Sequence, residues 1–269
     1  MTSLPTLNSL SIFVGTGQCN ANCAHCAGIM HRKNAPKQDG VIDRDLIYKT
    51  LKEAHERGAR YLSISSSGEP TLSPLSVTAA LELVHRCKKE GLEYSPINLY
   101  SNGIKIGEDK EFCDIYLPLW RNLGMTTIYV TVHDVDEKEN ARVYGVKSYP
   151  SLKLVLSRIH ESNLLMRANL VLNRRTIDTF EKFVSTASYL KNMGVDYISA
   201  WPIRGLDDKI DQNLSPLERE LNKMEEWIKN NQSHKYGIRL LREKNQGLYR
   251  DGRKITLFPD GTLSSAWCN

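Results

Sequence analysis

The chain has 269 residues, of which 41% are hydrophobic and 25% charged, a composition that is ordinary for a globular protein and argues against a disordered or fibrous chain. Its 36 basic and 31 acidic residues leave a small, unclustered net charge of +5, so a nucleic-acid interface is not expected. No apolar run has the length that spans a bilayer, and the first residues lack a signal-peptide pattern. Six cysteines without an even disulfide framework favour a reducing compartment, so we expect a cytoplasmic protein with no membrane partner.

Strand-length and helix-length segments alternate over the first 200 residues, which predicts a parallel sheet covered by helices. The expected strands cover residues 10–15, 61–65, 97–100, 127–132, 165–171 and 197–200. The expected helices cover 43–57, 74–90, 109–122, 150–161 and 177–192, with a short helix in the loop before the fourth of these. Six βα repeats are fewer than the eight of a closed TIM barrel, so we expect an open (β/α)6 partial barrel with ligands at the carboxyl ends of its strands.

The periodicity changes beyond residue 205. Residues 215–231 predict an amphipathic helix, and the last fifteen residues predict a β-hairpin around Asp260-Gly261. We therefore expect a core over residues 1–205, with a C-terminal helix and hairpin over 206–269 that cover the barrel.

Three cysteines crowd the loop that leaves the first strand. Cys19, Cys23 and Cys26 have the spacing C-x3-C-x2-C, and soft thiolates on one short loop suit an iron–sulfur cluster or zinc. A structural zinc site would take a fourth ligand, for which His25 and His31 are the candidates. A cubane held by only three cysteines would instead leave one iron open for a further ligand.

A second motif, Ser66-Ser67-Gly68-Glu69-Pro70, ends the second expected strand. Together, the two motifs resemble those of the radical S-adenosylmethionine (SAM) enzymes, with His25 at the usual aromatic position of C-x3-C-x-aromatic-C and Ser67 at the first Gly of Gly-Gly-Glu. The resemblance implies a [4Fe–4S] cluster on the three cysteines and SAM bound to its open iron. It also implies an electron donor such as flavodoxin or ferredoxin, and a 5′-deoxyadenosyl radical that abstracts hydrogen from a substrate C–H bond.

The same resemblance implies further SAM-binding residues, some of which have a structural alternative. The segment Ser67-Gly68-Glu69 would hold the methionine ammonium, because a glycine lets backbone approach a ligand and a carboxylate pairs with a cation; alternatively, Glu69 is a helix cap. Thr131 stands where related enzymes carry a Ser that touches SAM. Arg167, a charge inside a strand, would bind the SAM carboxylate or form a structural ion pair. Trp201, after the sixth strand, would pack on adenine or belong to the core.

Polar residues follow the later strands, where the mouth of the barrel is expected. They suggest a small hydrophilic substrate such as a sugar, cyclitol or nucleoside, although solvated loop tips would look the same. These candidates are Ser101, Asn102, His133, Asp134, Asp136 and Arg204.

Cys268 is the candidate catalytic residue outside the cysteine loop, since Cys87 and Cys113 lie on apolar helix faces and are expected in the core. Radical SAM epimerases finish by passing a hydrogen atom from a cysteine thiol to the substrate radical, so we expect a radical SAM oxidoreductase or isomerase, with Cys268 as the hydrogen donor of an epimerase. Two alternatives stay open: a radical SAM enzyme that modifies a peptide or nucleoside, and a zinc-stabilised binding protein on a (β/α) scaffold.

Overall fold

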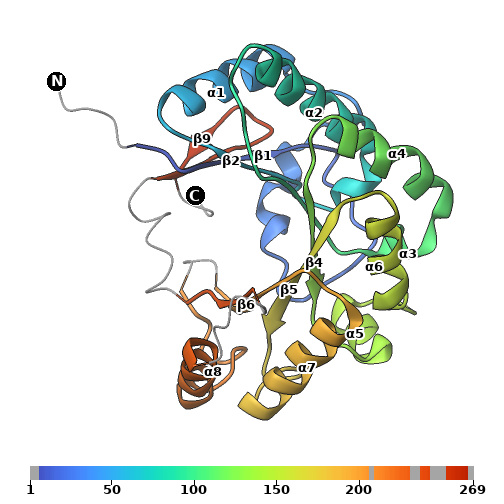
Figure 1. Ribbon diagram of the computed structural model, residues 1–269, viewed down its shortest axis with the longest axis vertical. Coiled ribbons are helices and arrows are strands. Elements are labelled where there is room, and N and C mark those ends of the chain that lie inside the picture. The colour runs from blue at the N-terminus through green and yellow to red at the C-terminus, as the bar shows by residue number, and fades with distance from the viewer. Residues whose placement is uncertain (1–5, 206–208, 231–236, 243–252, 266–269) are drawn as a thin grey trace.

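A computed structural model describes residues 6–205, 209–230, 237–242 and 253–265 (Figure 1). Within these ranges a single sheet has the strand order β7-β6-β5-β4-β3-β2-β1-β8-β9. Its first six strands in the chain are parallel neighbours, as expected: β1 (Ser9–Phe13), β2 (Tyr61–Ser65), β3 (Ile97–Ser101), β4 (Thr127–Val132), β5 (Leu165–Leu172) and β6 (Tyr197–Pro202). The predicted open, parallel (β/α)6 partial barrel is confirmed.

Three short strands extend this sheet at its two ends. β7 (Ile238–Leu240) pairs parallel to β6, and β8 (Lys254–Leu257) pairs parallel to β1. β9 (Leu263–Ser264) returns antiparallel to β8, so the hairpin predicted around Asp260-Gly261 is present. The hairpin continues the core sheet beside β1, a pairing that the sequence did not indicate.

The helices form an arc around the outside of the curved sheet (Figure 1). They are α1 (Arg44–Glu56), α2 (Pro74–Lys89), α3 (Ile104–Glu108), α4 (Lys110–Asn122), α5 (Glu137–Tyr144), α6 (Leu152–Glu161), α7 (Phe180–Met193) and α8 (Glu218–Asn230). Two 3-10 helices, η1 (Ala27–Asn34) and η2 (Pro70–Leu72), follow the two sequence motifs. None of the described helices combines the length and apolarity needed to cross a bilayer.

Aspartate side chains cap the N-termini of α1 and α4. The Asp43 carboxylate accepts a hydrogen bond from the Leu46 N–H at 2.9 Å, and Asp109 caps α4 in the same way. The sequence analysis missed the α-helix α3, since five residues are too few for a helical period. α8 begins three residues later than expected and packs on α7, where the Trp227 and Phe183 rings meet edge to face at 5.9 Å.

The two faces of the sheet differ in chemistry. On β2, Leu62 and Ile64 are fully buried against the helix side, so Ser63 and Ser65 face the inside of the barrel. Strands of a doubly covered parallel sheet are usually apolar on both faces. The polar inner face therefore indicates that the barrel interior serves a purpose other than packing; its positions include Ser11, Ser63, Asn98, Tyr100, Tyr129, Thr131, Arg167, Asn169, Ser199 and Trp201.

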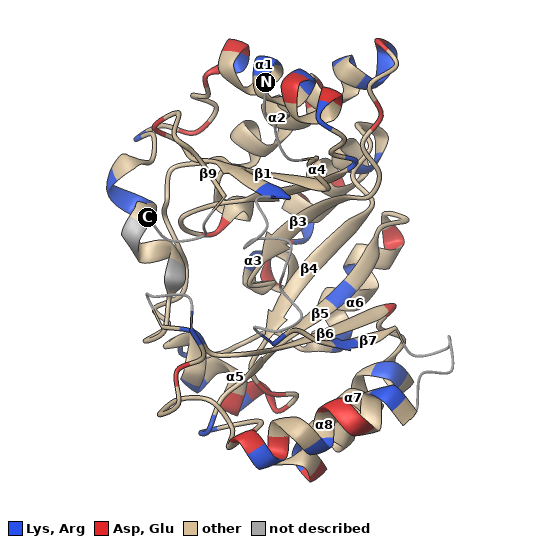
Figure 2. Cartoon of the chain, turned by 90° about the vertical axis from the view of Figure 1, so that its left-hand side faces the viewer, with Lys and Arg blue, Asp and Glu red and all other residues tan. Residues whose placement is uncertain are grey.

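The charges of the chain lie mainly on the outer helices and loops (Figure 2). Lys and Arg alternate there with Asp and Glu, as in the helical pairs Lys110–Asp114 and Arg142–Glu139.

Candidate functional site

The cysteine loop and the Ser-Gly-Glu segment form one backbone-packed unit. The Glu69 N–H donates to the Gln18 carbonyl at 2.7 Å. A Cβ on Gly68 would lie 2.1 Å from that carbonyl oxygen and 2.4 Å from the carbonyl oxygen of Gly17, so only glycine fits there. Gly28, just after the cysteines, similarly packs on the Ser67 carbonyl. The two motifs recognised separately in the sequence therefore meet at the carboxyl ends of β1 and β2.

Glu69 is buried and fully engaged with neighbouring donors. Its Oε1 accepts hydrogen bonds from the Thr71 N–H, the Thr71 hydroxyl and the Ser101 hydroxyl, and its Oε2 accepts one from the Asn102 N–H at 2.7 Å. Burial raises the pKa of this carboxyl, while the four hydrogen bonds act in the opposite direction. The structural alternative is thus realised, because Glu69 caps η2 and joins it to the turn after β3.

Ser101 and Asn102, proposed as substrate candidates at the mouth of the barrel, are not solvated loop tips. Both are buried, and the Asn102 side chain donates to the Asn20 side-chain oxygen at 2.7 Å and to the Cys19 sulfur at 3.9 Å. Asn102, at the end of β3, therefore holds the cysteine loop in place through these two hydrogen bonds. The fixed geometry of these two residues makes them part of the cysteine and Glu69 unit.

The three cysteines are half-buried and close enough to influence one another's ionisation. Burial above all, together with the neighbouring Cys26 and Cys19 thiols, raises the pKa of Cys23 to about 12, while Arg32 acts to lower it. Within the described ranges, no three His, Cys, Asp or Glu side chains converge closely enough to hold one metal ion. Three separated thiols fit a cluster with several irons better than one zinc ion.

The two histidines considered as a fourth zinc ligand, His25 and His31, both pack against aromatic rings. The His31 ring stacks on Phe258 of the C-terminal hairpin with 4.3 Å between centroids. The His25 ring packs edge to face on His133 at 5.1 Å, and burial lowers the pKa of His25. Both imidazoles thus serve as aromatic packing groups that fix the cysteine loop and η1.

The remaining candidates for SAM binding lie on the inner face. Thr131 is level with Asn169 in the β4–β5 register, and Arg167 lies with its guanidinium 4.1 Å from the Tyr129 ring centroid. Trp201 is the fifth residue of β6 rather than the residue after it. Among the described residues, no partner reaches the buried polar atoms Ser67 Oγ, Arg167 Nε, Asn169 Oδ1 and Trp201 Nε1. Orphaned polar atoms on one concave face fit a polar ligand.

The sequence analysis did not select Asn169. The available signal was its spacing, since Arg167 and Asn169 are two residues apart and so share one face of a strand.

The other expected mouth residues are placed in three different ways. His133 is almost completely buried beside Tyr144, and burial lowers its pKa to about 3. Asp136 is exposed and caps α5 by accepting from the Lys138 and Glu139 N–H groups. Asp134 and Arg204 are half-buried beyond β4 and β6, respectively. Cys268 lies outside the described residues. His133 is therefore buried below the surface of the barrel mouth, whereas Asp136 is solvated there.

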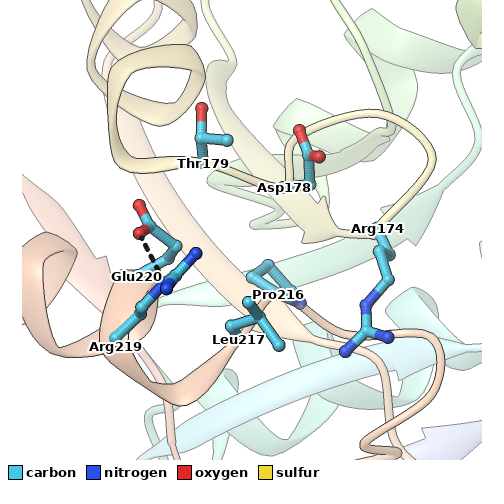
Figure 3. A pocket seen from close by; sticks show the side chains of 7 residues that line it. All are labelled: Arg174, Asp178, Thr179, Pro216, Leu217, Arg219 and Glu220. Carbon is cyan, nitrogen blue, oxygen red and sulfur yellow. Dashed lines mark ion pairs between the residues drawn. The ribbon is translucent and has the colours of Figure 1, made fainter.

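A separate hollow of about 300 Å³ lies between the loop after β5 and the start of α8 (Figure 3). Its charges are engaged within the protein: Glu220 pairs with Arg219 and Lys223, and Arg174 donates to two backbone carbonyls. This hollow contains none of the predicted site residues, and its chemistry is that of a helix junction.

Comparison with known proteins identifies the family. The model of the radical SAM superfamily matches residues 13–212. The GTP 3′,8-cyclase of Haemophilus influenzae (strain PittEE) is 23% identical over 171 residues, which is 63% of this chain and 47% of the cyclase. The chain thus spans about half the length of the curated relatives it matches.

Solved structures share the fold at low identity. Streptococcus suis SuiB bound to its precursor peptide SuiA superposes with a TM-score of 0.70 and 14% identity, covering 97% of this chain and 60% of SuiB. Native anSMEcpe with bound AdoMet gives a TM-score of 0.61 and 14% identity, covering 96% of this chain and 74% of anSMEcpe. The family match sets aside the zinc-stabilised binding protein, and the chain belongs to the radical SAM superfamily, whose enzymes use a [4Fe–4S] cluster and SAM.

Proposed function

We propose that Cys19, Cys23 and Cys26 hold the cluster and that SAM lies across the inner face above the barrel. The observation that carries this proposal is the backbone packing of Gly68 on Gln18, which joins the cysteine loop to the Ser-Gly-Glu segment. With both groups bound, their reductive chemistry supplies the 5′-deoxyadenosyl radical that abstracts a substrate hydrogen atom. The protein residues bind and orient SAM and the substrate.

The proposed SAM contacts follow the inner face from β2 to β6. Ser67 and Gly68 offer a hydroxyl and a closely approached backbone to the methionine ammonium, while Glu69 contributes its buried negative charge and holds the segment in shape. Arg167 is proposed to bind the carboxylate, since a guanidinium suits a carboxylate in geometry and charge. Thr131 is proposed to contact SAM, Trp201 to pack on the adenine ring, and His25 to hold the loop beside it.

We infer that the substrate is hydrophilic and carries negative charge. The described strands contain no Asp or Glu, yet three cations, Arg167, Arg239 and Lys254, occupy inner-face positions by their register. Burial lowers the pKa of the Lys254 ammonium, Tyr100 acts to raise it, and the nearby Arg167 charge acts to lower it, so a bound anion would favour the charged form of Lys254. Asp134 and Arg204, half-buried beyond β4 and β6, are candidate contacts from the rim.

The finer proposal is an epimerase in which Cys268 gives a hydrogen atom to the substrate. The substrate C–H bond would break to the 5′-deoxyadenosyl radical, and the Cys268 S–H would re-form a C–H bond on the opposite face. The thiyl radical left behind would take one electron from a flavodoxin- or ferredoxin-type donor and one proton, so each turnover would consume SAM. Support comes from the hairpin turn before Cys268, where Asp260 accepts from Asn34 of η1 at 2.7 Å, close to the cysteine loop.

A nucleotide- or peptide-modifying enzyme is the second candidate. The curated relatives are GTP 3′,8-cyclases, and GTP is both hydrophilic and anionic. Because the SuiB structure contains a bound precursor peptide, peptides should be among the candidate substrates tested.

The test is anaerobic turnover with SAM, dithionite and matched pairs of candidates, such as guanosine with GTP and a sugar with its phosphate. Only anionic members should increase 5′-deoxyadenosine release, and Lys254→Met should remove this preference. In deuterated solvent, an epimerase product would gain one deuterium at the inverted carbon, and Cys268→Ala would release 5′-deoxyadenosine without inverted product. If Cys268→Ala inverts the substrate at the wild-type rate, the epimerase proposal is wrong. Cys87→Ala, which removes a buried core thiol, is the control and should leave inversion unchanged.

A further inference from the structure

Arg32 bridges the two halves of the site. Its Nε donates to the Ser67 carbonyl at 3.1 Å, and its Nη2 donates to the Cys26 sulfur at 3.5 Å. The side chain is half-buried and belongs to η1, six residues after the last cysteine. Nothing in the sequence indicates this bridge, which depends on how η1 packs on the segment after β2.

The side-chain partner of Arg32 is the Cys26 sulfur. Over the described parts of the chain, its guanidinium donates to this sulfur and to the Ser67 carbonyl, and no Asp or Glu forms an ion pair with it. A cation that donates to a coordinating sulfur stabilises negative charge on a cluster, and hydrogen bonds to the sulfurs are among the factors that set cluster potentials. The reduced cluster carries one more negative charge than the oxidised cluster, so Arg32 stabilises the reduced form more strongly.

The second anchor of Arg32 limits where it can lie. The Ser67 carbonyl is enclosed by Gly28, on which a Cβ would lie 2.7 Å from the oxygen, and Gly17 packs on the Ser67 hydroxyl. The guanidinium is thus fixed between a cluster ligand and the segment proposed to hold the methionine ammonium. A planar fork reaches both acceptors at once, whereas a lysine ammonium on a flexible stem is a single point charge.

We propose that Arg32 is a positioning residue that raises the reduction potential of the cluster by bonding to Cys26 while it is held in place by Ser67. The proposal rests on the assignment of the cluster to Cys19, Cys23 and Cys26. It makes the cluster easier to reduce by the electron donor, which is the step that starts each turnover.

The test is a redox titration of anaerobically reconstituted protein, without SAM, followed by electron paramagnetic resonance. In Arg32→Gln, the ratio of reduced to oxidised cluster at a given potential should fall about tenfold, which is a shift of 59 mV for a one-electron couple. Lys33→Gln is the matched control, because it removes the same charge from the adjacent, exposed position and should change the ratio less than about twofold. Arg32→Lys keeps the charge and should give an intermediate shift.

The outcomes separate the two proposals. If wild-type protein holds no cluster of four irons, the proposed function fails. If wild-type protein titrates as a cluster but Arg32→Gln and Arg32→Lys both match it within twofold, or if Lys33→Gln shifts it equally, the role of Arg32 is overturned. Should Arg32→Gln fail to retain iron, the Arg32→Lys titration decides the question.

Discussion

Gly68 and Gln18 are in contact backbone to backbone, although fifty residues separate them in the chain. The carbonyl of Gln18 accepts the N–H of Glu69 and lies where a Gly68 side chain would begin. This contact fixes the position of the cysteine loop relative to the carboxyl end of β2. It explains why the second motif needs a glycine at position 68, although Ser67 replaces the glycine before it.

Gly68→Ala should therefore displace the cysteine loop. A Cβ 2.1 Å from a backbone oxygen cannot be accommodated without movement of one segment, so SAM affinity should fall about tenfold or more, equivalent to about 1.4 kcal/mol. Calorimetry with SAM measures this loss. Gly91→Ala is the control, since the added carbon would have no atom within 4 Å of it. Equal SAM affinity in both variants would mean that the contact has no role.

Replacing Cys19, Cys23 and Cys26 together with Ala should abolish the cluster. Anaerobic reconstitution should give about four irons per chain in wild-type protein and none in the variant, because thiolates are the ligands that clusters require. Iron analysis and visible absorption report this directly. Cys87→Ala and Cys113→Ala are the controls, since both thiols are buried in the core. Four irons in the triple variant would place the cluster elsewhere.

Glu69→Ala should cost stability as well as SAM affinity. The substitution leaves two N–H groups and two hydroxyl groups without their acceptor, and each buried, unsatisfied group costs about 1–3 kcal/mol. We expect the free energy of unfolding to fall by about 3 kcal/mol or more in urea denaturation. The surface control Glu82→Ala, which removes an exposed pair with Arg44, should cost less than about 1 kcal/mol. Similar losses in both variants would contradict the role of Glu69 as a structural centre.

Periodicity predicted the main elements of the barrel, because the alternation of strand and helix patterns is local information. The site was only partly predictable. The motifs located Cys19 and Glu69, but nothing local indicates that Asn102 turns inward to bond with Asn20, or that Arg32 returns to Cys26. These contacts depend on how segments distant in the chain pack together. The parallel pairing of β8 with β1 was unpredictable for the same reason.

Arg167→Ala should weaken SAM binding by about 1.5–3 kcal/mol, the range for a lost hydrogen bond to a charged group. Its guanidinium packs on Tyr129, so Arg167→Lys retains a cation near the same ring and should lose less. Titration calorimetry on all three proteins separates charge from geometry. Wild-type affinity in Arg167→Ala would remove the residue from the SAM site and leave it as a candidate for the substrate.

His133 should make the protein less stable in mild acid. Burial lowers its pKa to about 3, whereas a histidine in the unfolded chain titrates near 6.5, so only the unfolded chain takes up a proton between these values. Neutral His133 therefore makes its full contribution to the free energy of unfolding above about pH 6.5. This free energy declines by about 1.4 kcal/mol per pH unit as the pH falls from about 6.5 toward 3.

The check compares urea denaturation of wild-type protein and His133→Phe at pH 7.5 and 5.0. Phenylalanine keeps the ring contacts with His25 and Tyr144 and cannot be protonated. Its loss of stability between the two pH values should be about 2 kcal/mol smaller than that of wild-type protein. An identical loss in both proteins would show that His133 does not titrate in this way.

The outermost strands of the described sheet are also its shortest, with three residues in β7 and two in β9. The unpaired backbone groups at the margin of an open sheet can recruit a strand from another molecule, and short margins offer few of them. β8 pairs with β1 from Ser9 to Ile12 and thereby keeps the buried Leu10 and Ile12 strand away from the margin. The C-terminal hairpin thus protects the barrel against self-association, and a chain truncated before Lys254 would be expected to aggregate through β1.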